Sequence, residues 1–233
     1  MLLLVAALLC AVVGCVAPPA GRDDHLTVAD GTVTVHVPKS HDHVGVIVLH
    51  SYSHDATEMI KQGWSTSADR HGFVAAYPDR GTSWDAGLCC GAAESSQTDD
   101  VSWLESVVQV LRAKYSLTTI YLAGNSNGGM MVERLLAQDP AVSSAFAVWG
   151  AAPEMPTAGR WIGRGYLYDG AGDTTVPWKG GEVRIGGIET LIRPNQATDQ
   201  WLVGAHLHGY VIAHYGHAPE SGWPELAWKD LTS

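Results

Sequence analysis

The sequence predicts an α/β fold: a mostly parallel central sheet with helices on both faces. Three observations lead to this class. The run VGVIVLH at 44–50 is continuously apolar and bounded by loop residues, as expected of a strand buried on both faces. Strand-like and helix-like segments then alternate along the chain, and no shift in composition divides residues 25–233. We therefore expect one domain over 25–233.

Each further element follows from its local pattern. The segment LTVADGTVTVHVP alternates apolar and polar residues around Asp30-Gly31 and predicts an antiparallel hairpin. No insertion between strands is long enough for a cap domain. The remaining expected elements are a helix near 56–70, a strand at 73–78, a helix after Asp99-Asp100, a strand at 119–124, a helix over about 128–138, strands at 145–150 and 165–170, a helix near 197–205 and a last strand at 209–216.

Composition limits the class of partner. Of the 233 residues, 46% are apolar and only 16% are charged, which is typical of a globular protein rather than a disordered one. The formal net charge of −10 repels phosphate backbones and anionic lipid headgroups, and no cluster of Lys and Arg offsets it. We therefore expect no nucleic-acid partner.

The first residues, MLLLVAALLCAVVGC, resemble the apolar core of an export signal. Val12 to Cys15 resembles a bacterial lipobox, in which cleavage before the cysteine leaves Cys15 lipidated. We expect residues 1–24 to be signal and short tether, and the protein to be exported as a cell-surface lipoprotein or secreted. Plain secretion and an uncleaved anchor are the alternatives, because no Lys or Arg precedes the apolar run. The only expected membrane contact is this N-terminal anchor.

Processing at Cys15 would leave only Cys89 and Cys90, which are adjacent. In an oxidising compartment each has no other cysteine of its own chain to pair with. A disulfide between these neighbours and two free thiols are the two hypotheses.

The candidate nucleophile is Ser126. The segment GNSNGG at 124–129 is a G-x-S-x-G motif between an expected strand and an expected helix, the context in which this motif presents a reactive serine. Glycines on both sides permit the sharp turn. The helix N-terminus favours developing negative charge, and the N–H group of Asn127 can point at an oxyanion. A capping serine in a glycine-rich turn is the alternative.

A serine nucleophile needs a histidine base held by a carboxylate, which in this fold follow the serine in the order acid, then histidine. Asp173 lies in a loop just past the strand at 165–170, and Asp169, at the end of that strand, is the competitor. His217 follows the last strand and is the expected base, with His214 inside the strand as runner-up. His206 and His208 are expected before that strand, on the wrong side of the sheet.

No metal or other cofactor is expected. The pairs His41/His43 and His206/His208 have no accompanying Cys or carboxylate cluster with familiar ligand spacing. Three tryptophans in loop-like stretches, Trp84, Trp178 and Trp223, are candidates for a substrate-binding surface around the pocket, with core packing as the alternative.

Several motifs in order resemble the poly(3-hydroxybutyrate) depolymerase-like esterases, a group that also contains feruloyl and acetylxylan esterases and actinobacterial lipoprotein esterases. The resemblance covers most of 44–224, and the pairing of C-C-G with S-N-G-G is its most specific part. The motifs are L-H-S-Y-S at 49–53, W-D-A-G-L-C-C-G at 84–91, D-D-V at 99–101, G-N-S-N-G-G-M-M at 124–131, G-D-T-T-V-P-W-K-G-G at 172–181 and G-H at 216–217.

The resemblance implies an α/β-hydrolase fold with Ser126 as nucleophile, Asp173 as acid and His217 as base. It also implies that the N–H group of Tyr52 is the second oxyanion donor. Three departures stand out. Ser51 replaces the usual glycine, APESG intervenes before the W-P pair at 223–224, and the chain ends soon after Trp228, which leaves at most a stub of the expected last helix.

The sequence therefore predicts an exported serine carboxylic-ester hydrolase that works through an acyl-enzyme. Its expected substrates are polyester or hydroxyacyl esters, or feruloyl or acetyl esters, and the ester can be polymeric. A cell-wall acyltransferase and a catalytically inactive surface-binding protein with the same scaffold are the alternatives.

Overall fold

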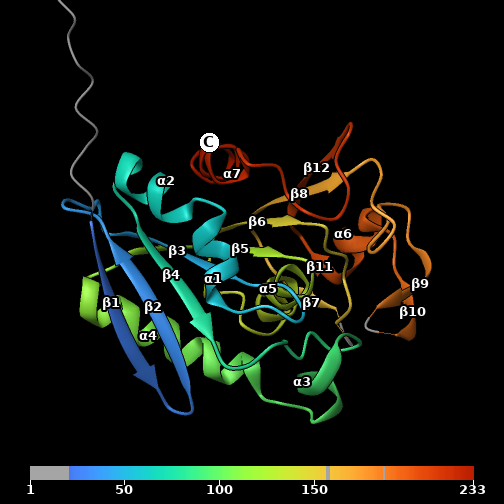
Figure 1. Cartoon of the computed structure of the whole chain (residues 1–233), viewed down its shortest axis with the longest axis horizontal. Helices are drawn as coiled ribbons and strands as arrows, with labels where there is room; N and C mark the ends of the chain where they lie inside the picture. Colours follow the sequence, from blue (N-terminus) through green and yellow to red (C-terminus); the bar gives the residue numbers. More distant parts are fainter. Residues whose placement is uncertain (1–20, 156–157, 186) are drawn as a thin grey trace, which may run out of the picture.

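The computed structural model describes residues 21–155, 158–185 and 187–233; the expected signal and Cys15 lie outside the described residues. Within them, one sheet has eight strands in the order β1-β2-β4-β3-β5-β6-β8-β12. From β4 to β12 the neighbouring strands run parallel (Figure 1). The strands of this sheet are β1 (Arg22–Val28), β2 (Gly31–Val37), β3 (Val44–Leu49), β4 (Val74–Asp79), β5 (Thr119–Asn125), β6 (Ala145–Trp149), β8 (Arg164–Gly170) and β12 (His206–Ile212).

The N-terminal hairpin begins earlier than the sequence predicts. Strand β1 pairs antiparallel with β2 from Arg22↔Val37 to Val28↔Gly31. The turn is therefore Ala29-Asp30, where Ala29 has a φ of 50°, rather than Asp30-Gly31. Because residues 22–24 already pair with β2, the expectation that the tether extends to residue 24 is wrong.

Helices cover both faces of the sheet, as the alternating pattern predicts. Apolar side chains of α4 and α5 pack on one face, and those of α1, α2 and α7 pack on the other. Figure 1 shows α2 and α7 together on one side and α4 on the opposite side. Among the described helices, none is both long and apolar enough to cross a bilayer. The helices are α1 (Ala56–Lys61), α2 (Trp64–His71), α3 (Gly91–Ser95), α4 (Asp100–Tyr115), α5 (Asn127–Gln138), α6 (Thr198–Trp201) and α7 (Trp223–Leu231).

Three expectations for the helices need correction. The single helix expected near 56–70 is two helices, because Gly63 takes a φ of 100° between α1 and α2. The helix expected near 197–205 is only the four-residue α6. The last helix is more than a stub, since α7 has nine residues and begins at Trp223-Pro224, with proline in the first turn where its missing N–H costs nothing.

In the described residues the sequence pattern missed one short strand before β8 and three between β8 and β12. A hairpin of β9 (Gly181–Ile185) and β10 (Ile188–Ile192) projects from the sheet, and β7 (Gly159–Arg160) pairs with β11 (Leu202–Val203). Strand β12 begins at His206, so His206 and His208 lie inside the last strand and not before it. His214 lies after this strand, with a φ of 70°, and not within it.

Candidate active site

Ser126 lies in a sharp turn between β5 and α5, as its motif predicts. Its φ of 51° and ψ of −121° place it outside the usual regions for a residue with a side chain. The flanking glycines are needed because a Cβ at Gly124 would lie 2.6 Å from the backbone of Gly128. A Cβ at Gly128 would lie 2.4 Å from the carbonyl oxygens of Leu49 and His50. The close approach of these backbones therefore fixes the serine at the top of the sheet.

The structure brings Ser126, His217 and Asp173 into hydrogen-bond contact. Nε2 of His217 lies 2.8 Å from Oγ of Ser126, and Nδ1 lies 2.7 Å from Oδ2 of Asp173. An ionised carboxylate only accepts hydrogen bonds, so Nδ1 carries the proton and Nε2 is free to accept from the serine hydroxyl. This is the arrangement in which an imidazole can take a proton from serine.

The Asp173 carboxylate is held in its charged form. Burial by itself would raise its pKa, but the bond to His217 and two backbone N–H groups hold the pKa below its usual range. Those N–H groups belong to Thr175 and Val176 and donate to Oδ1 at 2.7 and 2.9 Å. The acid is therefore fixed in place by the loop that follows β8.

The two alternative residues, Asp169 and His214, take no part in the hydrogen bonds between Ser126, His217 and Asp173. Asp169 is fully buried at the end of β8, and burial together with the nearby Asp173 raises its pKa. A carboxyl that holds its proton is poorly suited to stabilise an imidazolium. The runner-up base, His214, sits in the turn after β12 and makes no hydrogen bond to Ser126 or Asp173 among the described residues.

The N–H groups of Tyr52 and Asn127 remain the candidate oxyanion donors. Asn127 is the first residue of α5, and Tyr52 lies in the turn after β3. Within the described ranges neither N–H group has a protein acceptor. The Asn127 side chain accepts from the N–H of Trp84 at 2.7 Å and donates to the carbonyls of Trp84 and Cys89 at 3.0 and 3.3 Å. It therefore ties the 84–90 loop to the start of the nucleophile helix.

The expectation that Trp84 and Trp223 form a substrate surface is wrong. Both side chains are fully buried: Trp84 donates to the carbonyl of His50 at 2.9 Å, and Trp223 packs edge-on against Trp64. Trp178 is only partly buried and covers Gly209 of β12, so its role toward a substrate stays a prediction.

A small recess opens beside the Tyr52 turn. Cys89 and Cys90 are joined in a disulfide that forms part of its wall. The recess holds about 50 Å³. It is lined by Tyr52, Leu88, Cys89, Cys90, Gly91, Glu94, Ile185 and Thr190.

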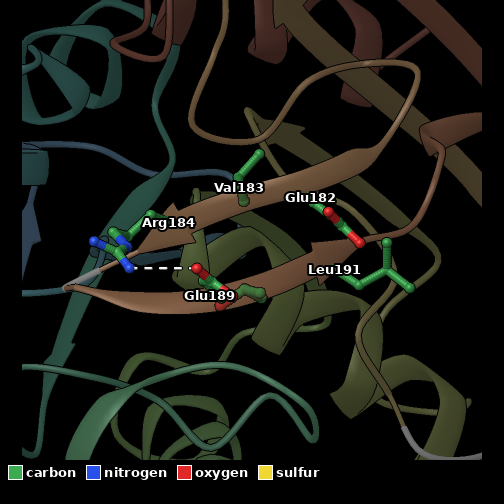
Figure 2. A pocket seen from close by; sticks show the side chains of 6 residues that line it. Glu182, Val183, Arg184, Glu189 and Leu191 are labelled. Atoms are coloured by element: carbon green, nitrogen blue, oxygen red, sulfur yellow. Dashed lines mark hydrogen bonds and ion pairs between the residues drawn. The ribbon is translucent and has the colours of Figure 1, made fainter.

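A larger, open depression of about 520 Å³ lies along the β9–β10 hairpin. Figure 2 shows its charged lining, with Arg184 and Glu189 joined across the two strands. None of Ser126, His217 and Asp173 lines it. Ser126, His217 and Asp173 do not line the smaller recess either, but Tyr52 does.

The histidine pairs form no metal cluster in the part of the chain that the structure describes, where no group of three or more His, Cys, Asp or Glu side chains is placed to hold a metal. The rings of His41 and His43 meet edge to face, and His208 stacks on Tyr166.

Sequence reasoning missed the polar residues that support the site. Glu58 bonds to Ser51 and Asn125, and the Asn127 side chain bonds to the 84–90 loop. One signal was available: two asparagines flank the serine in a buried turn, and buried amides require partners. The partner Glu58 could not be found this way, because it lies 67 residues before Asn125 in the sequence.

Comparison with known proteins bears on the fold. No family model matches the chain. A bifunctional acetylxylan esterase/xylanase from Neocallimastix patriciarum is 29% identical over 134 residues, which is 55% of this chain. The chain spans only 18% of that relative's length.

Solved structures match over nearly the whole chain at low identity. A carboxylesterase from Mesorhizobium loti has a TM-score of 0.68 at 15% identity and covers 91% of this chain and 99% of its own. An acetyl xylan esterase from Aspergillus awamori has 0.63 at 16%, covering 91% and 100%. An alpha-beta serine hydrolase homologue from Coxiella burnetii has 0.63 at 14%, covering 92% and 97%. The chain therefore has the α/β-hydrolase fold, as its sequence predicts.

Proposed function

We propose that the protein is a serine carboxylic-ester hydrolase that acts through an acyl-enzyme. The observation that carries this proposal is the continuous chain of hydrogen bonds from Ser126 through His217 to Asp173. The fold and the esterase relatives support the same reaction class.

Each residue has a distinct role in the proposed reaction. His217 takes the proton of Ser126 as its oxygen attacks the ester carbonyl, and Asp173 stabilises the resulting imidazolium. The N–H groups of Tyr52 and Asn127 bind the oxyanion of the tetrahedral intermediate. His217 then gives its proton to the leaving alcohol. Water repeats the attack on the acyl-enzyme and releases the acid.

The proposed substrates are esters of short acyl groups, acetyl foremost. The recess beside Tyr52 holds about 50 Å³, whereas a cavity that holds a benzene ring measures about 150 Å³. A recess of this size favours an acetyl methyl group over an aromatic feruloyl group. The acetylxylan esterase among the relatives supports this choice.

A hydrolysis panel tests the proposal. We expect p-nitrophenyl acetate to react with a higher kcat/KM than the butyrate and octanoate, and acetylated xylan to release acetate, with methyl ferulate and poly(3-hydroxybutyrate) far behind. Ser126→Ala should abolish each activity. An equally fast Ser126→Ala variant would overturn the mechanism, and a preference for methyl ferulate would overturn the substrate class.

We also propose, on the sequence argument alone, that the chain is exported and lipidated at Cys15. Cells that express Cys15→Ala should release the protein into the medium, while the unmodified chain stays in the membrane fraction. Equal distribution of the two proteins would contradict lipidation at this residue.

A further inference from the structure

One carboxylate connects the two backbone segments that carry the proposed oxyanion donors. Glu58, in the first turn of α1, accepts the N–H of Ser51 at 2.8 Å and the hydroxyl of Ser51 at 2.6 Å. It also accepts the side-chain amide of Asn125 at 3.2 Å. Ser51 directly precedes Tyr52, and Asn125 lies two residues before Asn127.

We propose that Glu58 is a positioning residue that sets the separation between the N–H groups of Tyr52 and Asn127. The inference rests on the proposed esterase function. Oxyanion donors accelerate a reaction because they are already in place when charge develops on the carbonyl oxygen. The Tyr52 donor belongs to a turn and the Asn127 donor to a helix, so an element that joins the two segments keeps their relative placement.

The local structure fixes Glu58 itself. Asp55 caps α1, since its side chain accepts the N–H of Thr57 at 2.8 Å. The N–H of Ala56 points to the carboxylate of Asp79 at the end of β4, at 3.4 Å. The carboxylate of Glu58 therefore extends from a short helix that is held at its own N-terminus and against the sheet.

The chemistry of the three donors favours a carboxylate over an amide. Two donors reach Oε1 and one reaches Oε2, and an ionised carboxylate accepts at both oxygens. A glutamine offers one oxygen and must turn an NH₂ group toward at least one of these donors. Glu58→Gln therefore loses at least one of the three bonds, and loosens the connection between the segments, while it keeps the shape of the side chain.

The same contact gives a role to Ser51, which stands where the resembled esterases usually have glycine. Its hydroxyl points to Glu58 and is buried, so it adds a second bond to the Tyr52 turn. A glycine keeps only the backbone bond.

Kinetics with p-nitrophenyl acetate test the inference, with the active sites counted by fluorophosphonate titration. We expect Glu58→Gln to lower kcat about 10- to 100-fold, the range expected when one donor is displaced, with KM within about threefold. Ser51→Ala should lower kcat less, because the backbone bond remains, and should add little to Glu58→Gln since both act on one connection. Glu105→Gln on α4 is the matched control.

A second readout separates positioning from a purely structural role. A trifluoromethyl ketone forms an oxyanion adduct on the serine, and its inhibition constant should rise with Glu58→Gln by the factor by which kcat/KM falls. A lower melting temperature with unchanged kcat and unchanged inhibition would overturn the inference. If Glu58→Gln does not fold, Ser51→Ala is the test variant. An unchanged kcat and an unchanged inhibition constant in Ser51→Ala would then overturn the inference.

The failures of the two proposals are distinguishable. A folded wild-type protein without esterase activity, or a fully active Ser126→Ala variant, overturns the proposed function and the inference with it. An activity that requires Ser126 but is unchanged in folded Glu58→Gln overturns the inference alone.

Discussion

Two buried carboxyl groups in this protein have pKa values shifted in opposite directions, although both are removed from water. Asp173 lies at the rim of the sheet and accepts bonds from His217 and two backbone N–H groups. Glu133 lies behind the nucleophile on α5, where its one bond, from Thr198, is long at 3.4 Å. Among the described residues its Oε2 has no partner.

The pKa of each carboxyl group depends on how many hydrogen-bond donors surround it. Burial and the hydrogen bonds at Asp173 together give a pKa below its usual range, whereas burial, with Glu154 nearby, raises the pKa of Glu133 to about 8. Burial with few donors therefore favours the neutral carboxyl group, whereas convergent donors favour the charged one. The rim of the sheet supplies those donors, and the interior behind α5 does not.

The largest expected effect is at Asp173. Asp173→Asn should lower kcat about 10⁴-fold, because an amide favours the wrong imidazole tautomer and cannot stabilise the imidazolium. Initial rates with p-nitrophenyl acetate measure it. Asp199→Asn on α6 is the control, since this exposed carboxyl contacts none of Ser126, His217 and Asp173, and we expect a rate within about threefold of wild type. A comparable loss in both variants would contradict the assignment.

The next effect is on stability. Because the pKa of Glu133 is raised in the folded state, that state binds more protons than the unfolded chain between about pH 4.5 and pH 8. The free energy of unfolding should therefore fall as pH rises through this window, by about 1.4 kcal/mol for each pH unit from this group. Denaturant titrations of wild type and Glu133→Gln should show a shallower decline for the variant. Parallel pH profiles would show that Glu133 is already charged in the folded protein.

The side chain of Asn127 differs from that of Glu133 in having hydrogen-bond partners for its polar atoms, so its removal should destabilise the fold. Asn127→Ala leaves the buried N–H group of Trp84 without its partner and removes one of the bonds to the carbonyls of Trp84 and Cys89, which still accept from Ala86. The free energy of unfolding should therefore drop by about 2–3 kcal/mol. Chemical denaturation measures the drop, with Gln109→Ala on the exposed face of α4 as control. A loss of stability no larger than that of the control would show that Asn127 does not stabilise the contact between the 84–90 loop and α5.

The smallest effect concerns the buried tryptophan. Trp223→Phe should cost about 1–2 kcal/mol of stability through lost packing against Trp64 and Trp149, and should leave KM unchanged. Thermal unfolding and acetate-ester kinetics measure the two quantities. A marked rise in KM would instead indicate that Trp223 contacts the substrate.

The sequence could predict those parts of the fold that carry a local signal. Continuous apolar runs marked β3, β4 and β6, and the glycines around Ser126 marked the turn before α5. The start of β12 was missed because this edge strand is largely exposed and has histidines where a core strand has apolar residues. The β9–β10 hairpin is likewise exposed and short.

The site residues also fall into those that have a local signal in the sequence and those that do not. Ser126, Asp173 and His217 could be predicted because each follows a strand at one edge of the sheet. The tryptophans could not be assigned, since a loop position says nothing about which way an indole points: Trp84 and Trp223 turn inward. Glu58 could not be predicted as part of the site, because only tertiary folding brings it to Asn125, 67 residues further along the chain.

The most direct test is covalent labelling with a fluorophosphonate, followed by mass spectrometry of the peptides. We expect one phosphonate per chain, on Ser126, with labelling abolished in Ser126→Ala and strongly slowed in His217→Ala. A folded protein that hydrolyses p-nitrophenyl acetate while Ser126 stays unlabelled, or that labels at another residue, would contradict it.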